Sequence, residues 1–167
     1  ADKVAINTAA VKRPDFIKEA SEKYGSQCIV ASIEAKKIGE DKWEAYTDTG
    51  RESTGLDAIE WAQKLTELGA GELLITSIDQ EGTKKGLDIN LIKKINDFVP
   101  IPVIACGGVG KPEDIFNLVK ETDVGAVACA SILHYDLFDI PSIKEFLKGK
   151  NITVREFERE QQAYSYR

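Results

Sequence analysis

The chain has 167 residues, of which 43% are hydrophobic and 30% charged, and its formal net charge is −6. This composition is typical of a globular protein, and the length allows one domain but not the roughly 250 residues of a closed eight-stranded β/α barrel. The negative charge argues against nucleic acid or an anionic membrane as the main partner, and no apolar run is long enough to span a bilayer. Three cysteines without C-x-x-C spacing are typical of a reduced, cytoplasmic protein.

The first third of the chain predicts two strands separated by a helix. Residues 2–8 alternate polar and apolar side chains, which indicates a strand followed by a ligand-type loop. Pro14 begins a helix that Gly25 ends, and residues 28–33 read as the next buried strand. Residues 35–54 form a long charged connection, in which we expect a small antiparallel hairpin. The chain starts on the first strand without a Met, so we expect that a preceding region is missing.

The middle of the chain carries the most informative stretch. Asp57 caps a helix with one apolar face, and Gly69 ends it. Residues 73–78 are an apolar run too short for a helix, and they indicate a buried parallel strand. Glu81 and Gly82 follow at the end of the strand where parallel sheets bind ligands, so they are candidates for acid–base chemistry and phosphate contact. An ordinary turn that ends a strand would have the same composition.

The remaining elements continue the alternation of strand and helix. They are a helix from Asp88 carrying Leu91, Ile92, Ile95 and Phe98, a strand at 103–106, a helix from Pro112, a strand at 125–129 and a helix at 141–147. Strict alternation implies a parallel sheet with right-handed crossovers. We therefore predict an α/β fold, a partial TIM (β/α)8 barrel of about five parallel βα units, over residues 1–157. Residues 158–167 are expected to form a polar C-terminal tail.

Candidate site residues lie just past the predicted strand ends. They are Asn7, Thr8, Glu34, Glu81, Gly82, Thr83, Gly107, Gly108, Ala130 and Ser131. The glycines and hydroxyl groups on each side are suited to phosphate, and Glu34 and Glu81 lie between them. This pattern predicts an elongated bis-phosphate ligand with Glu34 and Glu81 as a general acid–base pair. The alternative for Glu34 is an exposed carboxylate paired with Lys36 or Lys37.

Other reactive side chains do not form a recognisable site. Cys106 precedes two glycines, but His134 is the only histidine that could serve it as a base, so we interpret Cys106 as a packed thiol and His134 as a loop or cap residue. No cluster has the spacing of a zinc site, and we expect neither a metal nor a cofactor.

Four strings of residues resemble signatures of the cyclase subunit of imidazole glycerol phosphate synthase, an enzyme of histidine biosynthesis. They are A-D-K-V-x-I-N-T-A-A-V at 1–11, G-A-G-E-(x)3-T-S-I-D-x-x-G-T at 69–83, A-x-G-G-x-G-K at 105–111 and A-x-A-S-(x)2-H at 128–134. The resemblance runs from residue 1 to about Phe157 and covers strands four to eight of that family's (β/α)8 barrel. The sister isomerase of histidine synthesis shares the barrel but matches these strings less well.

The resemblance implies a lyase that takes ammonia from a glutaminase partner. The family joins this ammonia to a bis-phosphorylated ribonucleotide, phosphoribulosyl-formimino-AICAR phosphate, and releases imidazole glycerol phosphate and AICAR. By position, Lys3 and Glu72 match charged residues at an ammonia gate. Asn7 and Thr8 match one phosphate grip of the family. The other grip is matched by Gly82, Gly108, Ala130 and Ser131.

The chain also departs from the family pattern. Glu34 and Glu81 stand where the family has Asp, and Cys106 stands where it has Ser, while the usual catalytic Asp after the first barrel strand lies outside the matched region. One added methylene moves a carboxylate by roughly 1 Å, which can cost on the order of a hundredfold in rate. Two alternatives are therefore a paralogue that delivers ammonia to another acceptor, as in sugar amidation, and a phosphate-binding half-barrel without activity.

For the isolated chain we expect no cyclase turnover and a homo-oligomeric state. Five parallel strands cannot close a barrel, so the strands at 4–7 and 126–129 would be open edges that invite pairing with another chain. The inner face of the sheet would also be uncovered. Depending on register, it is expected to include members of the set Ile29, Ala31, Leu74, Thr76, Ile104 and Val127.

Overall fold

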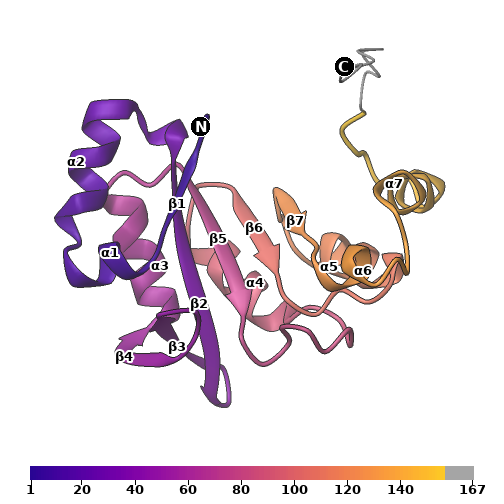
Figure 1. Ribbon diagram of the computed structural model, residues 1–167, viewed down its shortest axis with the longest axis horizontal. Coiled ribbons are helices and arrows are strands. Elements are labelled where there is room, and N and C mark those ends of the chain that lie inside the picture. Colours follow the sequence, from indigo (N-terminus) through magenta and orange to yellow (C-terminus); the bar gives the residue numbers. More distant parts are fainter. Residues whose placement is uncertain (157–167) are drawn as a thin grey trace, which may run out of the picture.

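Five parallel strands form the centre of the fold in the computed structural model, which describes residues 1–156 (Figure 1). They are β1 (Val4–Ile6), β2 (Ile29–Gly39), β5 (Glu72–Ser77), β6 (Val103–Cys106) and β7 (Ala126–Ala128). Their order across the sheet follows their order in the chain, and each neighbouring pair is parallel. This is the strand order of a (β/α)8 barrel, and it confirms the prediction of an α/β fold with a partial TIM-barrel-like sheet.

Each parallel strand is followed by at least one helix, as the alternating sequence pattern predicts. The longer helices are α2 (Asp15–Tyr24), α3 (Ala58–Glu67), α4 (Ile89–Phe98), α5 (Pro112–Glu121) and α7 (Ile140–Gly149). The caps act as expected: the Asp57 carboxylate accepts from two backbone N–H groups at the start of α3, and the Asp88 carboxylate accepts from one in α4. In Figure 1 the strands cross the middle of the molecule, with α2 and α3 on the left and α5 to α7 on the right.

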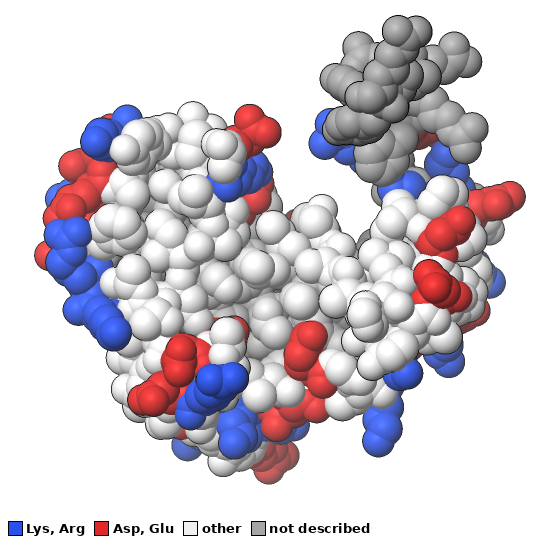
Figure 2. Space-filling model, viewed as in Figure 1, with Lys and Arg blue, Asp and Glu red and all other residues white. Residues whose placement is uncertain are grey.

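The two faces of the sheet differ sharply in burial. One face carries the core and lies against the helices; its residues are buried, namely Ala31, Ile33, Ala35, Leu73, Ile75, Ser77, Val103 and Ala105. The opposite face, here called the open face, consists of two cross-strand rows of residues that are at least partly exposed. One row is Ser32, Leu74, Ile104 and Ala126, and the other is Glu34, Thr76, Cys106 and Ala128. In Figure 2 the surface over the central strands is mostly uncharged, and charged side chains lie around its margin.

The register settles which predicted inner-face residues are uncovered. Leu74, Thr76 and Ile104 lie on the open face, as expected. Ile29 and Ala31 are 1% and 0% exposed on the helix-covered face, so they do not belong to the inner face. Val127 pairs with Ala105 and also lies on the covered side. Within residues 1–156, β1 and β7 each pair with a single strand, so the sheet has open parallel edges on both sides.

An antiparallel extension grows from the second half of β2. The expected hairpin is present: residues 34–39 of β2 pair with β3 (Lys42–Thr47). A further strand, β4 (Glu52–Asp57), pairs antiparallel with β3 and was not predicted. β1 and β3 therefore share one edge of β2, because β1 pairs with residues 29–31 and β3 takes over beyond them.

Three local predictions were wrong. The expected loop after the first strand is a short helix, α1 (Thr8–Lys12). β2 does not end at residue 33 but continues to Gly39, which places Glu34 inside the strand. Phe98 is 58% exposed, and the buried position at the end of α4 is taken by Val99. The predicted tail at 158–167 lies outside the described residues.

Candidate functional site

The predicted site residues lie at the carboxyl end of the parallel sheet, in two groups. Asn7 and Thr8 stand where β1 passes into α1, and Glu34 follows on the adjacent strand β2. The second group belongs to the loops after β5, β6 and β7. It comprises Glu81, Gly82, Thr83, Gly107, Gly108, Ala130 and Ser131, the last at the start of α6 (Ser131–His134).

Glu34 is the centre of the first group. Its Oε2 atom accepts from the Asn7 side-chain amide at 3.1 Å and from the Gly50 backbone N–H at 2.7 Å. The same Asn7 amide also donates to the Tyr46 carbonyl at 3.1 Å. Glu34 therefore joins β1, β2 and the β3–β4 turn instead of pairing with a lysine. Of the two lysines offered as its alternative partners, Lys36 lies over the Tyr46 ring and Lys37 over the Trp43 ring.

Thr8 and Asp79 attach the hairpin to the loops beside it. The Thr8 hydroxyl accepts from the Asp48 N–H at 3.3 Å, and the Asp79 Oδ2 atom accepts from the Lys37 N–H at 2.7 Å. Asp79 thus connects the β5–α4 loop to β2. Sequence reasoning did not assign Asp79 a site role, although it lies two residues before Glu81 in the same motif.

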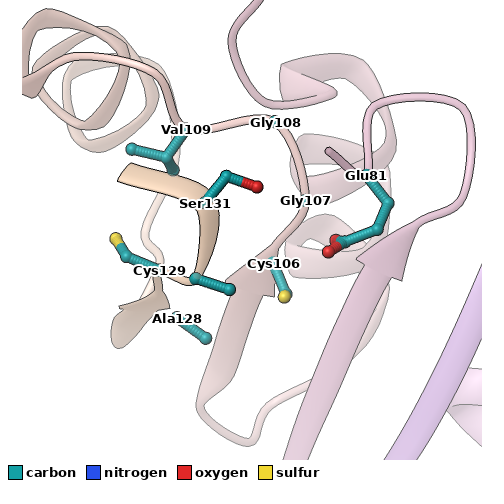
Figure 3. A pocket seen from close by; sticks show the side chains of 9 residues that line it. Glu81, Cys106, Gly107, Gly108, Val109, Ala128, Cys129 and Ser131 are labelled. Carbon is teal, nitrogen blue, oxygen red and sulfur yellow. The ribbon is translucent and has the colours of Figure 1, made fainter. Parts of the chain in front are cut away.

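Figure 3 shows the second group around a small pocket. Its lining residues are Glu81, Cys106, Gly107, Gly108, Val109, Ala128, Cys129, Ala130 and Ser131. The Glu81 carboxylate and the Ser131 hydroxyl both approach the Gly107–Gly108 segment from opposite sides in this view. The pocket has a volume of about 10 Å³, which is roughly what a single water molecule requires. The pocket is therefore too small to enclose a phosphate group.

Gly108 shows why the loop after β6 needs glycine. Its φ of +100° lies in the left-handed region, and a Cβ there would collide with the carbonyl of Gly86. The Gly86 N–H donates to the Gly108 carbonyl at 2.8 Å, so the loops after β5 and β6 are in direct contact. Gly82 and Thr83 belong to the first of these loops but do not line the pocket.

The two pocket cysteines are held as neutral thiols. Burial raises the pKa of Cys106, and the nearby Glu81 charge raises it further, against an opposing hydrogen bond with Thr76. Burial also raises the pKa of Cys129. His134 ends α6, packs edge-on against the Tyr135 ring at 5.0 Å between centroids, and does not line the pocket. These facts agree with the interpretation of Cys106 as a packed thiol, because a nucleophilic cysteine needs a lowered pKa or an adjacent base.

Lys3 and Glu72 lie at the opposite, amino end of the sheet. Their side chains form an ion pair although the residues are 69 positions apart. Glu72 starts β5 beside Val30 of β2, and Lys3 precedes β1 on the other side of β2. The pair therefore spans β2 at the end of the sheet remote from the two loop groups.

Neither a membrane-spanning helix nor a metal-binding cluster is present in the described part of the chain. No helix within residues 1–156 combines the length and apolar character required to cross a membrane. Among the same residues, no three His, Cys, Asp or Glu side chains are grouped so that they could hold a metal ion.

The chain is an α/β protein with a partial TIM-barrel-like fold. Its parallel strands follow chain order, helices cover one face of the sheet, and polar loops lie at the carboxyl ends of the strands. Residues 1–139 match the family model described as "Histidine biosynthesis protein". The match spans most of the chain, so the chain belongs to this family of histidine-biosynthesis enzymes. The family contains both the cyclase subunit and the sister isomerase of the pathway.

Proposed function

We propose that the chain is a part of the cyclase subunit of imidazole glycerol phosphate synthase. The observation that carries this proposal is the order of the side chains along the carboxyl edge of the sheet. Asn7 and Thr8 lie at one side, the Gly107–Gly108 and Ala130–Ser131 segments lie at the other, and Glu34 and Glu81 come from strand β2 and the loop after β5 between them. This order fits a ligand with a phosphate at each end and its reacting atoms in the middle.

Glu34 and Glu81 are the proposed acid–base pair for the reaction. Ammonia that adds to a carbon centre must lose a proton, and the departing nitrogen of the ribonucleotide must gain one. One side chain comes from β2 and the other from the loop after the neighbouring strand β5; as carboxylate, one can accept the first proton, and as carboxylic acid, the other can donate the second. Glu34 is oriented by Asn7 and Gly50, whereas the Glu81 carboxylate faces the pocket segment Gly107–Gly108.

Ammonia is proposed to enter at the amino end of the sheet from a glutaminase subunit. The Lys3–Glu72 ion pair stands at that end and would be the gate. An exposed ion pair of this kind contributes little to stability, so Lys3 and Glu72 can separate without disrupting the fold. The glutaminase would then dock over the amino ends of β1, β2 and β5.

One observation favours the second candidate, a paralogue that serves another ammonia acceptor. The Asn7 amide, assigned to a phosphate grip by the family resemblance, already donates to Glu34 and to the Tyr46 carbonyl. An amide has two N–H donors, so this Asn7 side chain has none left for phosphate. An acceptor without a phosphate on this side, such as a sugar, would suit the arrangement.

The test is the cyclase reaction in a complete barrel that contains this chain, with ammonium salt supplied in place of the glutaminase. Conversion of the ribulosyl nucleotide to imidazole glycerol phosphate is expected, and Glu81→Gln should lower kcat by about 10²–10⁴-fold while substrate affinity changes only a few fold. Glu113→Gln, an exposed glutamate at the start of α5, is the matched control and should behave as wild type.

Three results would count against parts of this proposal. Equal losses of rate and affinity in Glu81→Gln would make Glu81 a binding residue. Absence of turnover in the complete barrel, with binding of a phosphate ligand retained, would support the paralogue instead. Turnover by the 167-residue chain alone would show that the five parallel strands suffice, which we do not expect.

A further inference from the structure

The Lys84 side chain contacts an aromatic ring that follows the last loop of the proposed phosphate pocket. Its ammonium lies 4.5 Å from the centroid of the Tyr135 ring, the geometry of a cation–π contact. Tyr135 follows α6 directly, and its N–H donates to the carbonyl of Ser131, a pocket residue, at 3.1 Å. Ser131 and Tyr135 are thus about one helical turn apart, which is a rise of about 6 Å. The Lys84 ammonium therefore rests on the residue that follows α6, the short helix whose first residue, Ser131, lines the pocket.

The backbone of Lys84 is also fixed against a loop of the pocket. Lys84 has a φ of 57°, a left-handed conformation that is uncommon for a residue with a side chain. Gly110 packs so closely on it that a Cβ at Gly110 would lie 2.8 Å from the Lys84 Cβ atom. The adjacent Gly86–Gly108 hydrogen bond attaches the same segment to the loop after β6. A strained backbone that packing holds in place is a frequent feature of ligand sites.

The pocket itself lacks a positive charge. Glu81 is the only charged residue in its lining, and the chain as a whole has a net charge of −6. A phosphate group with close to two negative charges would face this carboxylate without compensation. Lys84 forms no ion pair with any carboxylate in the described part of the chain, so its charge is available.

We propose that Lys84 is an additional phosphate-binding residue of this site. The ammonium leaves the Tyr135 ring and donates a charge-assisted hydrogen bond to an oxygen of a phosphate monoester at the pocket mouth. A cation–π contact at an exposed position is weaker than such a bond, and the flexible stem of lysine allows the movement. This inference rests on the phosphate-binding role proposed above and identifies the cation that neutralises the ligand.

The experiment titrates the chain with inorganic phosphate at low ionic strength while backbone amide signals of Gly82, Gly108 and Ser131 are followed by NMR. Lys84→Gln should weaken phosphate binding about tenfold, as expected for one charge-assisted hydrogen bond. Lys85→Gln is the matched control, because it removes the same charge from the neighbouring exposed residue, and it should change affinity less than twofold.

A second variant separates direct binding from a structural role. Tyr135→Leu removes the ring on which Lys84 rests but leaves the ammonium, so phosphate should bind at least as tightly as to wild type. If Lys84 only clamps α6 through Tyr135, Tyr135→Leu should weaken binding as much as Lys84→Gln does, and the inference fails.

The remaining outcomes distinguish this inference from the proposed function. If phosphate shifts the Gly82 and Gly108 amide signals and Lys84→Gln binds phosphate with wild-type affinity, only the role of Lys84 is overturned and the phosphate site stands. No phosphate-dependent shift in the wild-type chain would overturn both the role of Lys84 and the phosphate site.

Discussion

At the scale of single residues, Asp88 joins two elements that are distant in the sequence. One oxygen of its carboxylate accepts from the Leu91 N–H and caps α4, and the other accepts from the indole N–H of Trp43 at 2.9 Å. Trp43 lies on β3 and is 0% exposed. A buried indole requires such a partner, since an unpaired polar group in the core is costly. Asp88 therefore links the antiparallel extension to the start of helix α4.

We expect Trp43→Phe to lower the free energy of unfolding by about 1–3 kcal/mol more than the same change at Trp61. Both substitutions remove indole surface from the interior, but only Trp43 loses a hydrogen bond to a carboxylate. Urea denaturation of the two variants measures the difference. Equal losses would mean that the Trp43–Asp88 bond makes no net contribution to stability.

The raised pKa values of the pocket thiols predict slow alkylation. At a given pH a raised pKa means less thiolate, so Cys106 and Cys129 should react with iodoacetamide more slowly than a free thiol, with rates still rising above pH 9. Burial is the main cause at both positions, and the negative charge of Glu81 adds to it at Cys106.

Glu81→Gln should therefore lower the pKa of Cys106 and speed its alkylation at pH 8, because a charge that opposes the thiolate is removed. Cys129 serves as the comparison within the same molecule, because burial is the main cause of its raised pKa and Glu81 is not among the causes. Mass spectrometry of the alkylated peptides reports both sites. An unchanged alkylation rate at Cys106 would show that the Glu81 charge does not act on this thiol.

At the scale of elements, the start of α5 holds the glycine-rich loop in place. The Asp114 carboxylate is 9% exposed and accepts from the N–H groups of Gly110 at 2.9 Å and Lys111 at 3.1 Å. These donors would otherwise remain unpaired at the helix start. The position of the loop after β6 therefore depends on a residue in the first turn of the next helix.

Asp114→Ala is expected to lower the free energy of unfolding by about 1–2 kcal/mol, the usual effect of losing a helix cap. Hydrogen exchange at Gly110 and Lys111 should become faster at the same time. Glu113→Ala is the control, because Glu113 is exposed in the same turn. If both variants exchange at the wild-type rate, the carboxylate does not restrain the loop.

The elements with strong patterns were predictable from the sequence, and those held by partners were not. The helices from Asp57 and Asp88 combine a cap with an apolar stripe, and both are confirmed. α1 has only five residues, too few to show helical periodicity. β4 has the polar sequence ESTGLD, and pairing with β3 makes it a strand, including a 2.5 Å bond from the Thr54 hydroxyl to the Ala45 carbonyl.

The site was predictable to a similar extent. Its residues follow from the rule that ligands bind at the carboxyl ends of parallel strands. Their grouping depends on long-range contacts, such as the bond from Asn7 to Glu34, that no local pattern encodes. Neither the contact of Lys84 with Tyr135 nor that of Asp79 with Lys37 has a signal in the sequence, because each pair is brought together only by the fold.

At the scale of the whole molecule, the open face and the two free edges predict self-association. Leu74 and Ile104 lie side by side on this face, partly exposed, and no helix within residues 1–156 covers them. Each Å² of apolar surface removed from water is worth roughly 25 cal/mol, so a second copy packed on this face would be favoured. We propose a homodimer or larger assembly in which the open faces meet.

Light scattering on the purified chain at tens of micromolar should show this assembly. Ile104→Glu should shift the chain towards monomer, because a carboxylate would be buried without a partner in the interface. Ile38→Glu is the control, since Ile38 is 58% exposed near the tip of the hairpin. A monomeric wild-type chain would contradict the proposal.

The shared edge of β2 limits how another polypeptide can extend the sheet. Beyond residue 31 that edge is already occupied by β3, so a further parallel strand on this side of the sheet can add only alongside β1, which has three residues. Three residues offer few backbone hydrogen bonds to an added strand. The β2–β3 hairpin lies directly beyond β1 and limits the length over which the added strand can pair. Repeated edge-to-edge pairing into fibrils is thereby opposed at the β1 edge, while addition of a single parallel strand there remains possible.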